Sequence, residues 1–204
     1  MFLKKLVVSF LNREIAMEIT FVSGNESKYK EITYALAPTY HVKRAKIDLV
    51  EIQGDPAEIA IAKCNEAYKV LNAPVIVEDS SLSFNALGGM PGPYIKYFYE
   101  SIGNQGLYKL LCAYEDKSAI SICAFAYKGS ANEEVVTFIG TTHGFIVSPS
   151  GTNNGFGWDD IFETSVISNG HVVKKRCSEM TLNEKISISP RTKALKQLVM
   201  YLSQ

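Results

Sequence analysis

The sequence predicts a mixed α/β fold of the α+β type, built as one body around a β-sheet. Three patterns support this prediction: a strand, a turn and a helix open the chain, alternating apolar segments follow in the middle, and an amphipathic helix from Arg191 closes it. A length of 204 residues fits one domain. Because the middle strands form a meander between helices, a pure βαβ Rossmann domain is disfavoured.

Local residue spacing predicts the first strand, the helix that follows it and a second helix. Glu18–Val22 has the pattern of a short buried strand that stops at Ser23-Gly24-Asn25, and Ser27–Leu36 continues with apolar residues at helical spacing. Asp55-Pro56-Ala57-Glu58 supplies an N-cap, a first-turn proline and a capping-box acid. These residues predict a second helix that ends near Leu71.

The middle of the chain predicts the strands of the sheet. Val75–Val77 is a continuous apolar run of the kind found in a central strand. Ile120–Tyr127 and Glu134–Thr142 alternate as antiparallel strands do, and Gly144–Ser148 is a candidate third strand.

Composition excludes several classes of function. The apolar fraction of 47% and the charged fraction of 21% are ordinary values for a globular protein with a full core. With 21 basic and 21 acidic side chains the formal net charge is zero, so duplex nucleic acid, which needs a basic surface, is not an expected partner. Cys64, Cys112, Cys123 and Cys177 lack zinc spacing and are typical of buried thiols in a reducing compartment, so the expected location is the cytoplasm.

Residues 1–16 stand apart from the rest. Their basic residues precede the first acid, Glu14, which makes a mitochondrial presequence the minor alternative. The apolar run Leu6–Leu11 is too short to span a bilayer, so no membrane partner is expected. The favoured interpretation is an extension from an upstream start, because Met17 directly precedes the first strand; residues 17–204 then form the domain.

The turn between the first strand and its helix is a candidate anion site. In Ser23-Gly24-Asn25-Glu26-Ser27-Lys28, free N–H groups at a helix start and the charge of Lys28 would favour a phosphate. The alternative is structural, because Ser, Asn and Gly are common in caps and turns of any protein. Taken alone, the segment is better explained as a structural turn.

Glu78 and Asp79 are two adjacent acids that directly follow the apolar run. α/β proteins place their sites at the carboxyl ends of buried strands, and oxygen ligands there suit Mg²⁺, which also binds substrate phosphates. Without further context, ordinary turn or cap residues explain such acids equally well.

Two further groups are candidates for substrate recognition. Lys63, Lys96, Lys185 and Arg191 are cations that would suit a triphosphate if they converged, although scattered lysines are usually solvated surface. Gly155-Phe156-Gly157-Trp158-Asp159 brackets aromatic rings with glycines, a pattern that favours stacking on a purine base over a role in the core.

Together these segments resemble the inosine triphosphate pyrophosphatase (Ham1-like) family. Ser23-Gly24-Asn25-x-x-Lys28 is similar to its opening motif. Glu78-Asp79-Ser80-Ser81-Leu82 and Leu87-Gly88-Gly89-Met90-Pro91-Gly92-Pro93-Tyr94-Ile95-Lys96 follow its longest signature, which is highly specific. Phe156-Gly157-Trp158-Asp159 resembles its base-site loop, and Glu179-Met180, Glu184-Lys185 and Ser189-x-Arg191 resemble its closing motif. The similarity runs from about Glu18 to Leu202 and leaves out residues 1–16.

The resemblance implies a homodimer of two-lobed protomers, each with a long mixed sheet and the nucleotide in the cleft between its lobes. It implies Mg²⁺, with Mn²⁺ as a substitute, held by Glu51 and Glu78, and it makes Asp79 the acid that orients or deprotonates the attacking water. The other implied site residues are a phosphate cradle of Ser23, Gly24, Asn25, Lys28, Lys63 and Lys96, and a base site of Phe156, Gly157, Trp158, Asp159, Lys185 and Arg191.

The implied reaction is hydrolysis of ITP, dITP and XTP to the nucleoside monophosphate and pyrophosphate, with activity that rises at alkaline pH. One departure concerns Pro190, which stands where the family has a histidine, in the sequence Ser-His-Arg. A lost imidazole contact to the base would affect selectivity for 6-oxopurines more than hydrolysis.

Three alternatives lie outside this family. The Phe156–Asp159 loop and the Gly88–Pro93 segment argue against a Maf-like pyrophosphatase for pyrimidine or modified nucleotides. The retained acids and lysines argue against a catalytically silent nucleotide-binding protein. A purely structural module would leave the ordered motifs unexplained.

Overall fold

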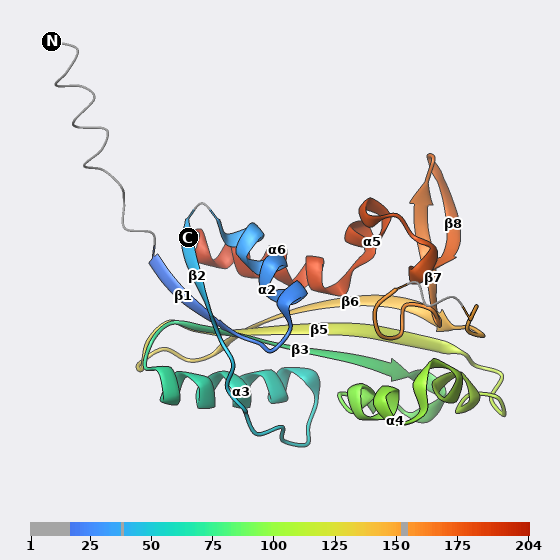
Figure 1. Ribbon diagram of the computed structural model, residues 1–204, viewed down its shortest axis with the longest axis horizontal. Helices are drawn as coiled ribbons and strands as arrows, with labels where there is room; N and C mark the ends of the chain where they lie inside the picture. Colours follow the sequence, from blue (N-terminus) through green and yellow to red (C-terminus); the bar gives the residue numbers. More distant parts are fainter. Residues whose placement is uncertain (1–16, 38, 152–154) are drawn as a thin grey trace, which may run out of the picture.

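The computed structural model describes residues 17–37, 39–151 and 155–204, and the expectations about residues 1–16 lie outside this range. Its centre is an eight-stranded sheet with the order β2-β1-β3-β5-β6-β7-β8, in which β4 pairs separately with β3 (Figure 1). β1 pairs in parallel with both β2 and β3. The pairs β3–β4, β3–β5, β5–β6, β6–β7 and β7–β8 are antiparallel. The mixed α/β fold predicted from the sequence is therefore confirmed. The strands are β1 (Met17–Val22), β2 (Tyr40–Ala45), β3 (Val75–Phe84), β4 (Pro91–Gly92), β5 (Ser118–Lys128), β6 (Val136–Ile146), β7 (Phe162–Ser168) and β8 (His171–Arg176).

Helices cover both faces of this sheet. In Figure 1, α2 and α6 lie above the long strands, and α3 and α4 lie below them. Within the described ranges, no helix combines the length and hydropathy needed to cross a membrane. The helices are α2 (Glu26–Leu36), α3 (Pro56–Leu71), α4 (Ile95–Lys109), α5 (Leu182–Ile188) and α6 (Pro190–Leu202), with short 3₁₀ turns at Asn85–Leu87 and Cys177–Glu179.

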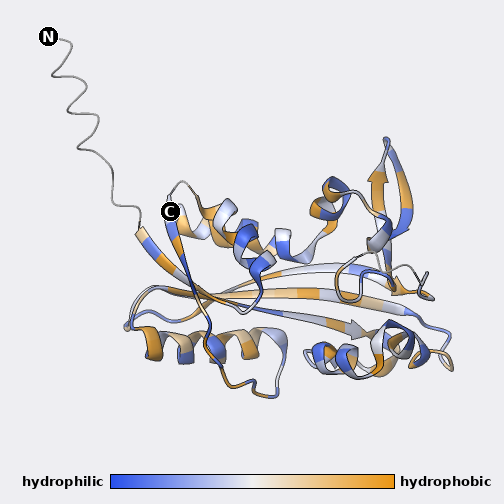
Figure 2. Ribbon diagram, viewed as in Figure 1, coloured by the Kyte–Doolittle hydropathy of each residue, from blue (hydrophilic) through white to orange (hydrophobic). Residues whose placement is uncertain are grey.

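The core follows from the alternation of side chains along the strands. Ile76 packs with α2 and α6, whereas its neighbours Val75 and Val77 pack with α3. A further cluster joins the far end of β3 to α4, β7 and the closing 3₁₀ turn, in accord with a body of two lobes. Figure 2 shows that α3 carries hydrophobic residues along its length among hydrophilic ones, as expected for a helix with one face on a sheet.

Two expectations about the strands were wrong. The central strand does not end at Val77 but continues to Phe84, because β5 pairs with it along its whole length. Glu78 and Asp79 therefore lie inside β3 and not at its carboxyl end. Gly144–Ser148 is not a separate strand either, since β6 continues through Gly144 to Ile146. A Cβ at Gly144 would lie 2.4 Å from the carbonyl oxygen of Glu163, so this glycine permits close contact with β7.

Candidate active site

The site is centred on a stretch of β3 that lacks a strand neighbour on one side. β1 accompanies β3 only as far as Val22, which lies opposite Val77, and the chain then turns away into α2. β4 takes the place beside β3 only from Leu82 onward. Residues 78–81 are thus left open between these two partners. Consecutive side chains of a strand point to opposite faces, so Glu78 and Asp79 belong to different clusters.

Glu78 is buried on the face covered by α2 and α6. Lys28 Nζ lies 2.9 Å from its Oε1, and Arg191 Nε lies 3.1 Å from the same oxygen. Ser80 Oγ donates a hydrogen bond of 2.9 Å to Glu78 Oε1 as well. Burial alone would raise the pKa of Glu78, but Lys28 and Arg191 outweigh burial and lower the pKa to about 2. This carboxylate is therefore ionised at neutral pH and already surrounded by donors.

Asp79 faces α3, where it shares a lysine with Glu51. Lys63 Nζ lies 2.9 Å from Asp79 Oδ1 and 2.8 Å from Glu51 Oε1. Tyr97 Oη, from α4, donates a hydrogen bond of 3.2 Å to Glu51 Oε2. Asp79 Oδ2 is buried and has no hydrogen-bond partner in the described part of the chain. Such an orphaned acceptor is costly unless a ligand satisfies it.

The pKa values of the two carboxylates that share Lys63 shift in opposite directions, although burial acts on both in the same direction. Burial raises the pKa of Asp79, and Lys63 compensates only in part. It would raise the pKa of Glu51 as well, but there the contacts with Lys63 and Tyr97 prevail and the pKa is lowered. For Lys63 itself, burial is outweighed by Asp79 and Glu51, which raise its pKa. Asp79 is thus the carboxylate with the greater tendency to accept a proton.

A cavity of about 330 Å³ opens beside Asp79 and Glu51. Its remaining wall is largely apolar and comes from α3, from the segment before it and from the start of α4: Ile52, Ile59, Pro93, Tyr94, Tyr97 and Phe98. The cavity therefore combines two carboxylates with aromatic and aliphatic walls. Lys96, a phosphate-binding residue predicted from the resemblance, lies at the same end of α4, with its ammonium 5.8 Å from the centre of the Tyr97 ring.

The predicted phosphate turn is a capped helix start. Asn25 Oδ1 accepts from the backbone N–H groups of Ser27 at 2.9 Å and Lys28 at 3.2 Å, and Ser23 Oγ accepts from Asn25 N at 3.1 Å. A Cβ at Gly24 would meet nothing within 4 Å. Arg44, which the sequence analysis missed, donates to the carbonyl oxygens of Ser23 and Gly24 and so braces the turn. No local pattern around Arg44 indicates this contact, because β2 brings it there.

The predicted base site is partly assembled. Lys185 of α5 is ion-paired with Asp159, which also accepts a 2.8 Å hydrogen bond from the backbone N–H of Phe156. The side chain of Phe156 is 69% exposed, whereas Trp158 packs against the core near α4. Gly157 has φ of 59°, a conformation that favours glycine. Arg191 does not join this group, because it lies against Glu78 and Glu31.

The residues suit a divalent cation that takes only two protein carboxylates. Among the described residues, no group of three or more His, Cys, Asp and Glu side chains could hold a metal ion. Of the acids predicted for the site, Glu51 is brought together with Asp79 and not with Glu78. Mg²⁺ commonly binds one or two carboxylates and takes its other ligands from phosphates and water. Asp79 Oδ2, which has no hydrogen-bond partner in the described part of the chain, is available as a ligand of such an ion.

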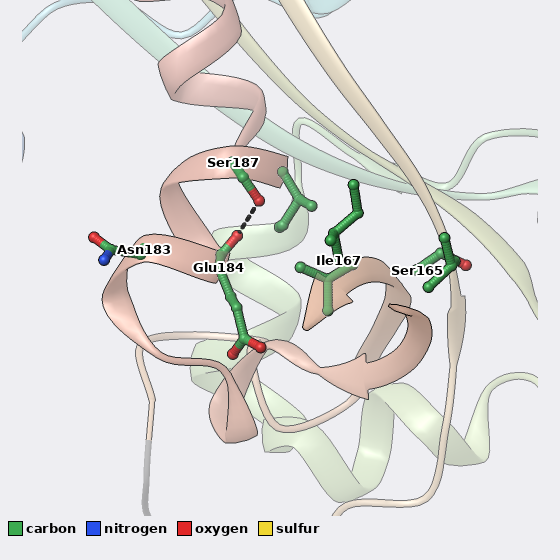
Figure 3. Close-up of a pocket in the computed structure, with 8 residues that line it drawn as sticks. Ser165, Ile167, Asn183, Glu184 and Ser187 are labelled. Atoms are coloured by element: carbon green, nitrogen blue, oxygen red, sulfur yellow. Dashed lines mark hydrogen bonds between the residues drawn. The ribbon is translucent and has the colours of Figure 1, made fainter. Parts of the chain in front are cut away.

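A larger cavity of about 480 Å³ lies elsewhere, between α5 and the β7–β8 hairpin (Figure 3). Ser165 and Ile167 of β7 line one side, and Asn183, Glu184 and Ser187 of α5 line the other. Ser187 Oγ donates a hydrogen bond of 2.7 Å to the carbonyl oxygen of Glu184. None of the site residues predicted from the sequence lines this cavity, so the candidate active site is the smaller one.

Comparison with known proteins shows which family the chain resembles. The model of the Ham1 family matches residues 19–201. The chain is 46% identical over 189 residues to an inosine triphosphate pyrophosphatase of Yarrowia lipolytica, covering 92% of this chain and 97% of that protein. It is 44% identical over 186 residues to the inosine triphosphate pyrophosphatase of Pyricularia oryzae, covering 91% and 94% of the two chains.

Solved structures show the same architecture. A Ham1 protein from Coxiella burnetii superposes with a TM-score of 0.78 at 28% identity, over 92% of this chain and 98% of the other. A nucleoside-triphosphatase, or dITP/XTP pyrophosphatase, from Mycobacterium abscessus does so with a TM-score of 0.70 at 27% identity, over 89% and 98%. These matches favour the Ham1 family over the Maf-like alternative.

Proposed function

The chain belongs to the Ham1 family, and we propose that it hydrolyses ITP, dITP and XTP to the nucleoside monophosphate and pyrophosphate. The observation that carries this proposal is the group of Asp79, Lys63 and Glu51, joined through the Lys63 ammonium, beside the cavity of about 330 Å³. It combines a candidate base, a cation for phosphate and a second carboxylate. The names of the relatives supply the substrate class, since they are inosine triphosphate pyrophosphatases.

The phosphates would lie along the open edge of β3. Lys28 reaches this edge from the α2 face and Lys63 from the α3 face, so a polyphosphate there would meet positive charge from both sides. Lys96, at the start of α4, would add a third charge. The turn Ser23-Gly24-Asn25 would contribute less through its backbone, because Asn25 already occupies the N–H groups of Ser27 and Lys28.

The resemblance implied Glu51 and Glu78 as the metal ligands, but Glu78 lies on the opposite face of β3 from Glu51. We therefore propose that Glu51 and Asp79 would hold Mg²⁺, or Mn²⁺ as its substitute. When bound, the ion would offset the negative charge that develops on the phosphates. Oδ1 of Asp79 stays fixed by Lys63, whereas Oδ2 has two lone pairs and would both face the ion and accept a hydrogen bond from the attacking water, whose proton it would take. Glu78 serves this arrangement less directly, since Lys28, Arg191 and Ser80 already hold it.

The base would lie near Asp159 and Lys185. Lys185 can donate to the 6-oxo group of hypoxanthine, and the exposed ring of Phe156 offers a face for stacking. Gly157 would shape the loop that presents them, and Trp158 would support the loop from the core. Arg191 can reach the base only if it leaves Glu78, so its contribution would depend on the bound nucleotide.

The remaining proposals concern assembly and location. We infer a homodimer in the cytoplasm, with a small-molecule nucleotide as the substrate and neither nucleic acid nor a membrane as a partner. Light scattering on the purified protein would test the dimer, and a monomer at micromolar concentration would refute it.

A kinetic panel tests the proposed reaction. ITP, dITP, XTP, ATP, GTP and CTP are each incubated with the protein and Mg²⁺, and pyrophosphate and orthophosphate are scored separately. We expect pyrophosphate from the first three and little from the others. Release of orthophosphate instead, or equal turnover of all six nucleotides, would rule out the proposed activity.

A further inference from the structure

Both carboxylate oxygens of Glu51 are held, each by a different helix. Lys63 Nζ of α3 lies 2.8 Å from Oε1, and Tyr97 Oη of α4 donates to Oε2 at 3.2 Å. Lys63 belongs to the predicted site, whereas neither the sequence motifs nor the comparisons assign a role to the hydroxyl of Tyr97. The side chains of Glu51 and Tyr97 also share the wall of the cavity that contains Asp79.

Glu51 needs such an anchor because of where it lies in the chain. It belongs to residues 46–55, a connection between β2 and α3 without regular secondary structure. Nearby backbone anchors are a 3.0 Å hydrogen bond from Val50 N to Glu66 and the cap at Asp55. The side chain of Glu51 is 44% exposed, so its own packing does not fix its rotamer. Its orientation depends on Lys63 and Tyr97.

We propose that Tyr97 is a positioning residue for the divalent cation: its hydroxyl orients Glu51 so that both Glu51 and Asp79 present oxygens to the ion. This inference rests on the proposed function, which makes these two carboxylates the protein ligands. Groups that hydrogen-bond to metal ligands fix the ligand geometry before the ion arrives, and their loss typically lowers affinity about 10-fold or more. Because a carboxylate oxygen can accept more than one bond, the hydroxyl leaves Oε2 able to bind the ion.

Tyr97→Phe tests the hydroxyl alone. It removes only that group and keeps the aromatic ring, whose centre lies 5.8 Å from the Lys96 ammonium. Tyr97 is 51% exposed, so folding should not depend on it. The same substitution at Tyr99, on the same helix and 37% exposed, is the matched control, because its hydroxyl makes no hydrogen bond to another described residue.

The experiment measures Mn²⁺ binding to the full chain without nucleotide, by electron paramagnetic resonance of the free ion. We expect the Kd of Tyr97→Phe to rise about 10-fold and that of Tyr99→Phe to match the wild type. In ITP hydrolysis, Tyr97→Phe should be slow at limiting Mg²⁺ and recover a near wild-type kcat at saturating Mg²⁺. A residue that merely supports the fold would not give this dependence on the ion.

Three results would overturn the inference, and they are distinguishable. If Tyr97→Phe binds Mn²⁺ like Tyr99→Phe while Glu51→Gln binds it poorly, the cation site stands and the role of Tyr97 is refuted. If kcat stays low at saturating Mg²⁺, Tyr97 acts on another step. If Glu51→Gln binds Mn²⁺ like the wild type, or the wild type binds none, the proposed cation site fails and the inference fails with it.

Discussion

Asp79→Asn should separate catalysis from stability. The substitution keeps the shape of the side chain, and its amide oxygen can still accept the hydrogen bond that Lys63 donates to Oδ1 at 2.9 Å. It removes the carboxylate oxygen that has no partner and with it the capacity to take a proton from water. Asp79 is also a proposed ligand of the ion, so kcat is compared at saturating Mg²⁺. Loss of a general base costs about 10²–10⁴-fold in rate, and we expect kcat to fall by that factor while nucleotide binding survives.

The same substitution should change the folding free energy little. Burial raises the pKa of Asp79 above its ordinary value, which means that the ionised form is disfavoured in the folded state. Asparagine removes that cost. Lys63 loses one ionic partner but keeps Glu51 at 2.8 Å. We expect these effects to offset each other within about 1 kcal/mol, which for a chain of this size is a Tm change of about 2–4 °C.

The sign of the pH dependence follows from the raised pKa. The folded protein holds the proton of Asp79 more tightly than the unfolded chain does, so this group adds stability at acidic pH and loses it as pH rises through the folded pKa. Wild type should therefore gain stability relative to Asp79→Asn on acidification, and its kcat should fall as Asp79 becomes protonated. Pyrophosphate release and thermal unfolding at several pH values test both. A kcat within a few-fold of wild type, or a Tm loss above about 8 °C, would refute the reasoning.

Two substitutions test the supports of the site. Lys63→Met leaves Asp79 buried without a direct cation. We expect the free energy of unfolding to fall by about 3–5 kcal/mol at neutral pH and by less at acidic pH, as measured by urea unfolding. Equal losses at both pH values would show that the charge of Asp79 is not the cause. Gly140→Ala would place a Cβ 1.9 Å from the Pro190 carbonyl oxygen, a backbone atom that cannot move aside as a side chain does. We expect the free energy of unfolding to fall by about 1–3 kcal/mol. ITP turnover should also weaken, because the shift of α6 would displace Arg191. Gly24→Ala, whose Cβ would meet nothing within 4 Å, is the stability control, and equal unfolding free energies for the two variants would contradict the prediction.

Local signals in the sequence predicted the parts of the fold that short-range chemistry determines. Asp55 caps α3 with the reciprocal bonds of a capping box, as its neighbours indicate. α4 was not predicted, and Gly103, with φ of 61°, interrupts its helical pattern. The end of β3 could not be read locally, since pairing with β5 carries the strand past Val77 to Phe84.

Contacts between distant segments also decide how the candidate site residues group. Residue types and motif order pointed to the acids and lysines as candidates, but did not indicate how they group. Once Glu78 and Asp79 lie inside a strand, the pleat sends them to opposite faces, and this separates Glu78 from Glu51. Arg191 meets Glu78 across 113 positions of sequence, and Tyr97 meets Glu51 across 46. Such pairings depend on the tertiary fold, which spacing alone does not encode.

Pro190→His restores the residue that the family motif has at this position, and the structure allows it. Pro190 is the first residue of α6, where a new backbone N–H needs no helical partner, and Ser189 continues to cap the helix through Thr192 N at 3.3 Å. The imidazole would add one hydrogen bond to a 6-oxopurine. A neutral hydrogen bond is worth about 0.5–1.5 kcal/mol net, so kcat/KM for ITP should rise by up to about tenfold while that for ATP stays nearly constant.

Pro190→Ala separates the gain of an imidazole from the loss of the proline ring. If the histidine reads the base, only Pro190→His should raise the ratio of kcat/KM for ITP over ATP, whereas Pro190→Ala should leave that ratio unchanged. Both variants keep the carbonyl oxygen that lies close to Gly140, so the contact of α6 with β6 is the same in each. An unaltered ratio in Pro190→His would mean that position 190 does not contact the base in this chain. Discrimination would then have to come from Lys185 and Asp159, whose ion pair is already formed beside the exposed ring of Phe156.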